Sequence, residues 1–544
     1  MPSPFAQHLG TNYCPSDDEV LELKNLIAEP IRQLLTLDEE ISQLQRSIEK
    51  LQEKRKTLST YVDEHKALIS PIRRIPQDVL SEIFFACLPT HRNCVMSASE
   101  APVLLGRICS SWRALSLATP RLWASLHIAE PRVRSGLYED KIVQRLEVMK
   151  MWLARSGQCP LSISFQCTDY VAPADDASTG ILPHPVPVDV FPREIVSFAR
   201  RWRHVNFTAS LPALLPMATL TAADVPMLES VGLFIHFPDE NPLAHFGFLD
   251  APRISDFSAY SGEMSTSRLS PLRWNLLTNL AVKLNAWEVP LTIERALELL
   301  SSCPRLRTCS FWVGDPVIPT NTPDAPVELL HLDTLELSVT IEGSSFLKKL
   351  YAPNLRKFVI RGNTQDSLPQ FLRSSISLES LDIEGPHYSK TSLLEVLRAV
   401  SPTMRHLIIR DFWGSSVTRF LDDEFMEMLT PVSHCVDISQ CCCPSLQSLT
   451  VACRHDISDW AVEQFVVRRM STTDHSTPSL KRVRFQFNRP MKLDIASKLK
   501  SFMDAGFEVE MMYSISRASH LSPWFGLPDS REPWIPEDGY PAHW

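Results

Sequence analysis

Cysteine and histidine side chains, which are common metal ligands, gather in one stretch near residue 440. Zinc sites usually show paired C-x-x-C or H-x-x-x-H spacings, and three adjacent cysteines cannot all aim at one ion. We therefore interpret these residues as buried or loop thiols, and we expect no metal and no cofactor. The stretch comprises Cys435, Cys441, Cys442, Cys443 and Cys453, with His434 and His455 beside them.

Signals for catalysis are weak in the rest of the chain. The acidic run Asp422-Asp423-Glu424 fits the start of a helix better than a paired-carboxylate site. The sequence contains no G-x-S-x-G, G-x-G-x-x-G, Walker or H-E-x-x-H motif. We therefore expect a binding protein and no catalytic residue. An unrecognised enzyme in the C-terminal region is a weaker alternative, which would require a deep pocket holding perturbed titratable groups.

Composition and charge exclude several classes of protein. The net charge of −9 over 544 residues argues against a nucleic-acid binder, which needs a basic stripe. No run of eighteen apolar residues predicts a membrane span, and the N-terminus lacks the pattern of a signal peptide. Thirteen scattered cysteines fit reduced thiols. We therefore expect a cytoplasmic and/or nuclear protein.

A heptad pattern dominates the N-terminal region, where we expect a mobile segment at 1–15 and a helical segment at 16–69. Ser16 and Glu19 have the spacing of a capping box, and Pro30 is expected to interrupt the helix. Apolar residues then recur in alternating steps of three and four, which predicts a coiled coil over residues 34–62 and a possible homodimer. An antiparallel hairpin with residues 17–29, or packing on the following module, is the alternative. The seam comprises Leu34, Leu37, Ile41, Leu44, Ile48, Leu51, Arg55, Leu58 and Val62.

Residues 70–128 form the stretch on which the functional prediction depends. Pro76 suits the start of a short amphipathic helix, and Thr119-Pro120 closes a second helical run that begins at Val103. Three small helices in about sixty residues lie near the lower limit for an independent core. We therefore expect spare apolar surface that meets a partner or the next domain.

The order of motifs in this stretch resembles the F-box of large fungal F-box families. The matching segments are Ile75-Pro76-x-Asp78-Val79-Leu80-x-x-Ile83-Phe84, Ile108-Cys109-x-x-Trp112-Arg113 and Pro120-x-Leu122-Trp123. The resemblance implies docking on a Skp-type adaptor of an SCF cullin–RING ubiquitin ligase. It also implies adaptor-facing residues, of which some must instead form the module's own core: Ile75, Pro76, Val79, Leu80, Ile83, Phe84, Ile108, Cys109 and Trp112.

A repeat of the form L-x-x-L-x-L follows. Subtracting successive first positions gives intervals of 23 to 29 residues, with 42 and 34 for the last two, and most fall in the range of leucine-rich repeats. Helix-like stretches at 291–303 and 392–403 lie between copies, and we interpret residues 421–443 in the 42-residue interval as one extra helix plus an exposed insertion. The first positions are Trp202, Leu228, Ile254, Leu277, Leu306, Leu332, Leu355, Leu378, Met404, Leu446 and Leu480.

Stacking of such units builds a continuous core that a single unit cannot form. We therefore expect an irregular leucine-rich-repeat-like solenoid over 135–512, a horseshoe of short parallel strands and helices. In leucine-rich repeats, an asparagine usually occupies the turn after the strand. Only one repeat of this chain has an asparagine at that position, Asn363. The Pro- and Trp-rich tail 513–544 is expected to cap the last repeat, with an exposed recognition strip as the alternative.

Side chains between the strand leucines should line the concave face of the horseshoe and bind a target protein, although an ordinary solvated sheet face is the simpler interpretation. Together with the F-box resemblance, this face predicts a substrate receptor of a ubiquitin ligase with an unknown target. A repeat scaffold without a ubiquitin role is the alternative. The residues selected are Trp312, Glu336, Arg361, Asp382, Arg410, Arg482 and Arg484.

Overall fold

The computed structural model describes sixteen segments of the chain and divides it into two compact units, Met1–Ile83 and Phe84–Trp544. No helix within these segments is both long enough and apolar enough to cross a membrane. The described residues are 3–131, 138–167, 189–236, 242–260, 271–283, 290–314, 325–339, 343–362, 367–384, 390–400, 403–410, 421–431, 442–453, 457–471, 480–487 and 489–513.

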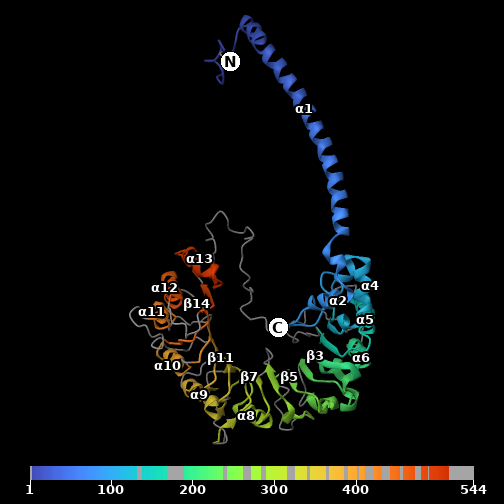
Figure 1. The fold of residues 1–544 in the computed structure, drawn as a ribbon, viewed down its shortest axis with the longest axis vertical. Coiled ribbons are helices and arrows are strands. Elements are labelled where there is room, and N and C mark those ends of the chain that lie inside the picture. The colour runs from blue at the N-terminus through green and yellow to red at the C-terminus, as the bar shows by residue number, and fades with distance from the viewer. Residues whose placement is uncertain are drawn as a thin grey trace, which may run out of the picture. The chain divides into compact units, whose positions relative to one another are not determined.

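One long helix, α1 (Asp17–Leu68), makes up most of the first unit (Figure 1). Its start has the expected capping box, in which the Glu19 carboxylate accepts from the Ser16 backbone N–H at 2.7 Å. The expected interruption at Pro30 is wrong, because the helix continues through it. Proline removes one backbone hydrogen bond, but here the long regular turns on both sides are retained.

Short helices follow α1 and continue into the second unit. A 3-10 turn, η1 (Pro71–Arg74), precedes α2 (Gln77–Ala86), whose last three residues belong to the second unit. The helical run predicted from Val103 is instead two helices, α3 (Leu105–Ile108) and α4 (Ser110–Ala118). A 3-10 turn, η2 (Pro120–Trp123), follows α4.

The break between α3 and α4 lies at Cys109. Its backbone is extended, with φ −155° and ψ 169°, and its sulfur accepts a hydrogen bond from the Trp112 backbone N–H at 3.5 Å. Cys109 is therefore the N-cap of α4, a role usually filled by an oxygen-bearing side chain. Helical periodicity continues across such a break, which is why the sequence pattern concealed it.

Fourteen parallel strands of the second unit form one sheet, in the order β1-β2-β3-β4-β5-β6-β7-β9-β11-β12-β13-β14-β15-β16. Figure 1 shows the strands along the inner side of an arc. Their bounds are Ser125–Ala129, Leu161–Gln166, Trp202–Ser210, Ser230–His236, Asp256–Tyr260, Asn279–Lys283, Thr308–Val313, Thr334–Val339, Lys357–Gly362, Ser380–Glu384, His406–Arg410, Ser448–Cys453, Arg482–Phe487 and Glu508–Tyr513. A separate two-stranded sheet pairs β8 (Val327–Glu328) with β10 (Leu350–Tyr351).

Helices lie along the outer side of the arc (Figure 1). Several connections contain 3-10 turns and no α-helix among their described residues, such as η10 (Trp274–Leu276) between β5 and β6, which makes the described solenoid irregular. The α-helices are α5 (Tyr138–Arg155), α6 (Val190–Val196), α7 (Leu211–Leu214), α8 (Ile293–Ser302), α9 (Leu368–Ser374), α10 (Lys390–Val400), α11 (Asp423–Met428), α12 (Asp459–Met470) and α13 (Ala496–Asp504).

The strand register explains the leucine repeat. Leu335 pairs with Phe358 and Leu337 with Ile360, so equivalent apolar residues stack from strand to strand. Each of these side chains is fully buried. The stacked residues form one continuous core between the sheet and the helices, as the logic of a solenoid requires.

All eleven repeats lead into strands of the sheet, and the helices expected in three intervals are α8, α10 and α11. Three strands of the sheet lie outside the predicted repeats. β1 belongs to the sheet although all but its last residue lie in the stretch assigned to the F-box, β2 precedes the first repeat, and β16 lies beyond the last one. Asn363 and residues 514–544 lie outside the described residues, so the predicted roles of the asparagine and the tail remain predictions.

Candidate protein-interaction surfaces

The predicted adaptor-facing residues of α2 alternate between buried and exposed positions. Leu80 and Phe84 are 6% and 0% exposed, whereas Val79 and Ile83 are 46% and 39% exposed. Residues four apart share one face of a helix, so α2 has one buried apolar face and one exposed apolar face. Leu80 and Phe84 are therefore core residues, and Val79 and Ile83 remain available to a partner.

The second half of the F-box-like stretch divides in the same way. Ile108 is 56% exposed and Cys109 is exposed, whereas Trp112 is half-buried and its ring centroid lies 4.8 Å from that of Phe84. Trp112 is thus largely a packing residue. Of the first motif, Ile75 is half-buried and Pro76 exposed.

Two tryptophans join this stretch to the solenoid. The Trp123 indole Nε1 donates to the Ser116 carbonyl at 2.8 Å, and its ring meets that of Trp152 in α5 edge to face, at 4.8 Å between centroids. Both tryptophans are buried. The turn η2 therefore packs on α5, within the compact unit that also contains the sheet.

Four of the predicted target-binding residues form one ion-pair cluster on the inner face of the sheet. Arg361 lies 3.4 Å from the Glu336 carboxylate and 3.1 Å from that of Glu384, one on each neighbouring strand. The Arg410 guanidinium lies 3.1 Å from the Asp382 carboxylate. The positively charged side chains in the cluster are thus matched by carboxylates of the same chain.

Asp382 has the most unusual environment in this cluster. Asp382 is only 8% exposed. Burial raises the pKa of its carboxyl group above the ordinary value, although the positive charges of Arg410 and Arg361 oppose this shift. One carboxylate oxygen, Oδ1, is buried without a hydrogen-bond partner. This part of the inner face is therefore partly desolvated before any partner binds.

The two remaining predicted arginines are paired with a strand that sequence reasoning missed. Arg482 lies 3.3 Å from the Glu508 carboxylate, and Arg484 lies 3.3 Å from that of Glu510. Both glutamates are in β16, the edge strand. The alternation Glu508-x-Glu510 before Met512 is the signal that could have located this strand.

A third patch on the inner face is aromatic and was not predicted. The Phe234 ring meets that of Tyr260 at 5.1 Å between centroids, and the Lys283 ammonium lies 4.8 Å from the Phe234 ring centroid. Burial lowers the pKa of Lys283, and Glu336 partly offsets this effect. Tyr260 and Lys283 are paired in the register of β5 and β6. Half-buried Trp312, in β7, is the predicted residue that lies outside both ion-pair clusters.

Metal-ligand geometry is absent from the described part of the chain, in which no three His, Cys, Asp or Glu side chains could share an ion. Cys442 is half-buried and Cys443 is buried. Burial raises the pKa of the Cys442 thiol and so disfavours its thiolate. The side chains of the other candidates, at 434, 435, 441, 453 and 455, lie outside the part of the chain that the structure describes.

Comparisons with known proteins identify no family. No family model matches the chain, and no curated protein matches it. One similar solved structure is Rad7 in complex with Elc1 from yeast, with 15% identity, 63% of this chain and 86% of that chain covered, and a TM-score of 0.31. Another is the leucine-rich repeat-containing protein LegL7 from Legionella pneumophila, with 12% identity, 59% and 96% covered, and a TM-score of 0.29. Both TM-scores are too low to support an argument about function. The chain has a leucine-rich-repeat-like solenoid by its own strand order, and the F-box resemblance stays a prediction.

Proposed function

We propose that this protein is a substrate receptor of an SCF-type ubiquitin ligase. In this proposal the exposed residues of the F-box-like stretch dock on a Skp-type adaptor, and the inner face of the sheet binds a target protein. The receptor itself performs no chemistry. It raises the effective concentration of target lysines near a ubiquitin-conjugating enzyme held by other subunits, in the cytoplasm or the nucleus.

The exposed face of α2 is the observation that carries the proposal. Isolated exposed apolar residues are common on protein surfaces, but Val79 and Ile83 lie one turn apart on the same helix and at positions that the F-box motif assigns to the adaptor. Their buried neighbours Leu80 and Phe84 hold the helix in place without using this face. Core and docking roles are therefore carried by different residues of one short motif.

The inner face supports the second half of the proposal. Its arginines are held by carboxylates on adjacent strands, which fixes the orientation of their planar donor groups before a partner arrives. The aromatic patch at Phe234 and Tyr260 adds apolar contact area on other strands of the same face. Aromatic and arginine side chains are the types that contribute most to protein interfaces.

Binding of a purified Skp-type adaptor to the full chain tests the proposal. The Val79→Glu/Ile83→Glu variant should lose binding by at least about tenfold, because it places two charges in an apolar contact. Leu330→Glu is a matched control, since Leu330 is 47% exposed but lies in the solenoid, and it should bind like the wild type.

Two outcomes would contradict the proposal: no adaptor binding by the wild type, or equal binding by wild type and double variant. The repeat scaffold without a ubiquitin role would then be the better interpretation. Circular dichroism of both variants shows whether a loss of binding reflects unfolding.

A further inference from the structure

We propose that α1 pairs with α1 of a second copy of this chain in a parallel, in-register, two-stranded coiled coil over residues 34–62. This inference does not depend on the proposed function. It concerns only the first unit of the chain.

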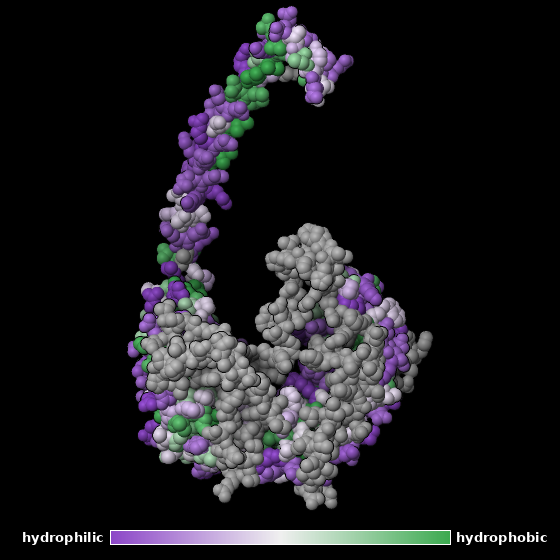
Figure 2. Space-filling view, turned by 180° about the vertical axis from the view of Figure 1, so that it is seen from behind, coloured by the Kyte–Doolittle hydropathy of each residue, from purple (hydrophilic) through white to green (hydrophobic). Residues whose placement is uncertain are grey.

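The apolar seam of α1 is exposed along its whole length. In the space-filling view, hydrophobic side chains of α1 stand among hydrophilic ones (Figure 2). An isolated helix gains little stability in water from its own turns, and a seam of this length requires an apolar partner. The exposed fractions are 60% for Leu34, 52% for Leu37, 50% for Ile41, 64% for Leu44, 53% for Ile48, 67% for Leu51, 56% for Leu58 and 44% for Val62.

The residue types at the seam favour two strands in parallel. With Leu34 as position a of a heptad, the next two a positions are Ile41 and Ile48, and every d position from residue 37 to residue 58 is leucine. β-Branched residues at a combined with leucine at d are typical of parallel dimers. A partner with the same seam is therefore the simplest occupant, and a second copy supplies it.

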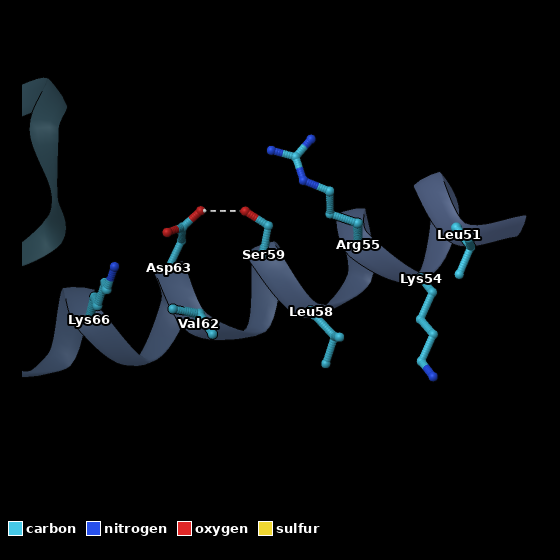
Figure 3. A pocket seen from close by; sticks show the side chains of 8 residues that line it. All are labelled: Leu51, Lys54, Arg55, Leu58, Ser59, Val62, Asp63 and Lys66. Atoms are coloured by element: carbon cyan, nitrogen blue, oxygen red, sulfur yellow. Dashed lines mark hydrogen bonds between the residues drawn. The ribbon is translucent and has the colours of Figure 1, made fainter. Parts of the chain in front are cut away.

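The surface of α1 also has the shape that such a partner needs. One stretch of the helix carries a wide-open groove of about 490 Å³. Figure 3 shows the side chains that line it. In a coiled coil, each side chain at a or d inserts into a hole formed by four residues of the facing helix. The groove contains two successive holes of this kind, the first formed by Leu51, Lys54, Arg55 and Leu58 and the second by Arg55, Leu58, Ser59 and Val62.

Charges beside the seam permit the parallel in-register arrangement. In that arrangement each g residue faces the e residue five positions later on the other helix. None of the five facing pairs brings two like charges together. The pairs are Gln33 with Asp38, Glu40 with Gln45, Ser47 with Gln52, Lys54 with Ser59 and Tyr61 with Lys66.

Arg55 is the exception within the seam, because it is a charged residue at an a position. In the parallel pair it faces Arg55 of the second copy, which weakens the dimer but disfavours higher oligomers, where more guanidinium groups would converge. A single polar a residue also penalises shifted registers, in which it would face an apolar layer. We therefore assign to Arg55 the role of fixing the register of the coiled coil and the number of helices in it.

The mass of the full chain in solution tests the dimer. Light scattering should give twice the chain mass for the wild type and one chain mass for Leu44→Glu/Ile48→Glu. Gln43→Glu adds the same kind of charge on the other side of the helix and should stay dimeric. A wild type with the mass of one chain would overturn the proposal.

A variant that strengthens the dimer provides a second test, because a misfolded variant would not bind its partner more tightly. Arg55→Ile should lower the dissociation constant of the dimer by roughly tenfold or more, because it replaces a charged layer with an apolar one. An unchanged or higher dissociation constant would contradict the assigned role of Arg55.

Disulfide cross-linking tests the orientation. Leu44→Cys should form a dimer-linking disulfide under mild oxidation, because only the parallel in-register pair places residue 44 opposite itself. The wild type, which carries all native cysteines, is the control. Failure of the variant to cross-link above the wild type, while remaining dimeric by light scattering, would overturn the parallel arrangement.

Discussion

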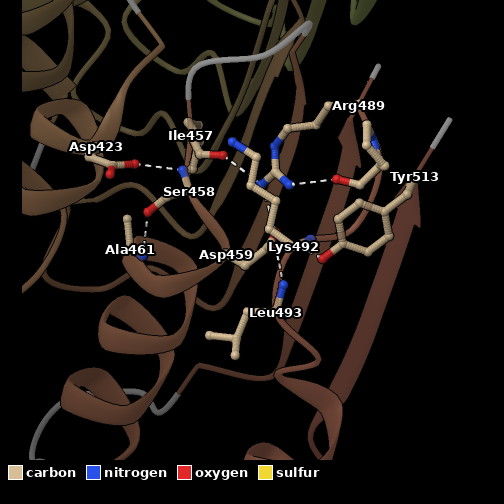
Figure 4. A network of polar contacts seen from close by, with 10 residues as sticks. Asp423, Ile457, Ser458, Asp459, Ala461, Arg489, Lys492, Leu493 and Tyr513 are labelled. Carbon is tan, nitrogen blue, oxygen red and sulfur yellow. Dashed lines mark hydrogen bonds and ion pairs between the residues drawn. The ribbon is translucent and has the colours of Figure 1, made fainter. Parts of the chain in front are cut away.

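The Arg489 guanidinium lies 2.6 Å from the Asp459 carboxylate, and the two side chains are 6% and 1% exposed (Figure 4). The second Asp459 oxygen accepts from the backbone N–H groups of Lys492 and Leu493 at 2.9 and 2.8 Å, and the Tyr513 hydroxyl donates to the first at 3.0 Å. This buried pair joins the start of α12 to the segment before α13 and to the last strand. It therefore fastens the C-terminal end of the solenoid.

Replacing Arg489 by methionine should destabilise this end of the solenoid by about 3–5 kcal/mol, because the variant leaves a buried carboxylate without its counter-charge. Urea unfolding and hydrogen exchange of α12 and β15 measure the effect. The double variant Arg489→Met/Asp459→Asn should recover part of the loss. Additive effects of the two changes would contradict a direct interaction.

Stability at low pH should depend on Asp459. Burial alone would raise the pKa of this carboxyl, but the hydrogen bonds from Arg489 and the two backbone N–H groups outweigh burial and hold the pKa below its ordinary value. Its stabilising contribution is therefore present above the unfolded pKa of about 3.9 and is lost as pH falls through the lower folded pKa. Acid titration of the Asp459→Asn variant should show a smaller loss of stability in this window than the wild type shows.

Shortening a side chain to alanine should cost different amounts of stability on the two faces of α2. Phe84→Ala should cost about 3–5 kcal/mol, because its side chain has no exposed surface. Ile83→Ala should cost less than about 1 kcal/mol, because Ile83 is 39% exposed. Thermal unfolding measures both, and similar costs for the two changes would contradict the division into a core face and an exposed face.

Gly362 and Gly506 provide a matched pair for the effect of close packing. Both have positive φ, at +95° and +98°, but a Cβ at Gly362 would lie 1.9 Å from the Val339 carbonyl oxygen, whereas one at Gly506 would meet nothing within 4 Å. Gly506→Ala should therefore cost only about 1 kcal/mol of backbone strain. Gly362→Ala should cost more than about 2 kcal/mol, because the β9–β11 pairing must also shift. Urea unfolding of the two variants tests the difference.

Loss of Arg410 should have an effect that depends on pH. Arg410 is one of the groups that lower the pKa of Asp382, so Arg410→Gln should raise this already elevated pKa further. When the pKa of a carboxyl is higher in the folded protein than in the unfolded chain, the free energy of unfolding falls as pH rises from the unfolded pKa of about 3.9 through the folded pKa. The variant should therefore be less stable than the wild type at pH 7 and closer to it near pH 4. Arg405→Gln is the control, because Arg405 and Glu379 are 3.8 Å apart and exposed.

The repeats were predictable because few folds other than a solenoid have the pattern L-x-x-L-x-L with most copies 23 to 29 residues apart. Leu335 and Leu337 show why the pattern works: each stacks on its equivalent in the next strand. β16 escaped prediction because two of its inner positions are glutamates and none of its residues is fully buried. Cys109 escaped it because a cap does not disturb helical spacing.

The candidate sites were predictable only in part. Alternation along a strand placed Arg361 and Asp382 on the inner face, but their carboxylate and guanidinium partners come from other strands and depend on register. The division of the F-box-like residues required burial, which spacing alone does not give: Val79 and Leu80 are neighbours in the sequence with opposite environments. Pro30 was misjudged because a long helix tolerates the loss of one hydrogen bond.

Each described strand of the fourteen-stranded sheet is paired only with the strands next to it in the sheet order. Because each repeat packs mainly on its two neighbours, a whole repeat can be duplicated or lost while the other repeats keep their strand pairing. The length of the inner face is therefore open to evolutionary change by gain or loss of repeats, without redesign of the two ends. A lineage could enlarge or shrink its recognition surface in steps of one strand and its connection.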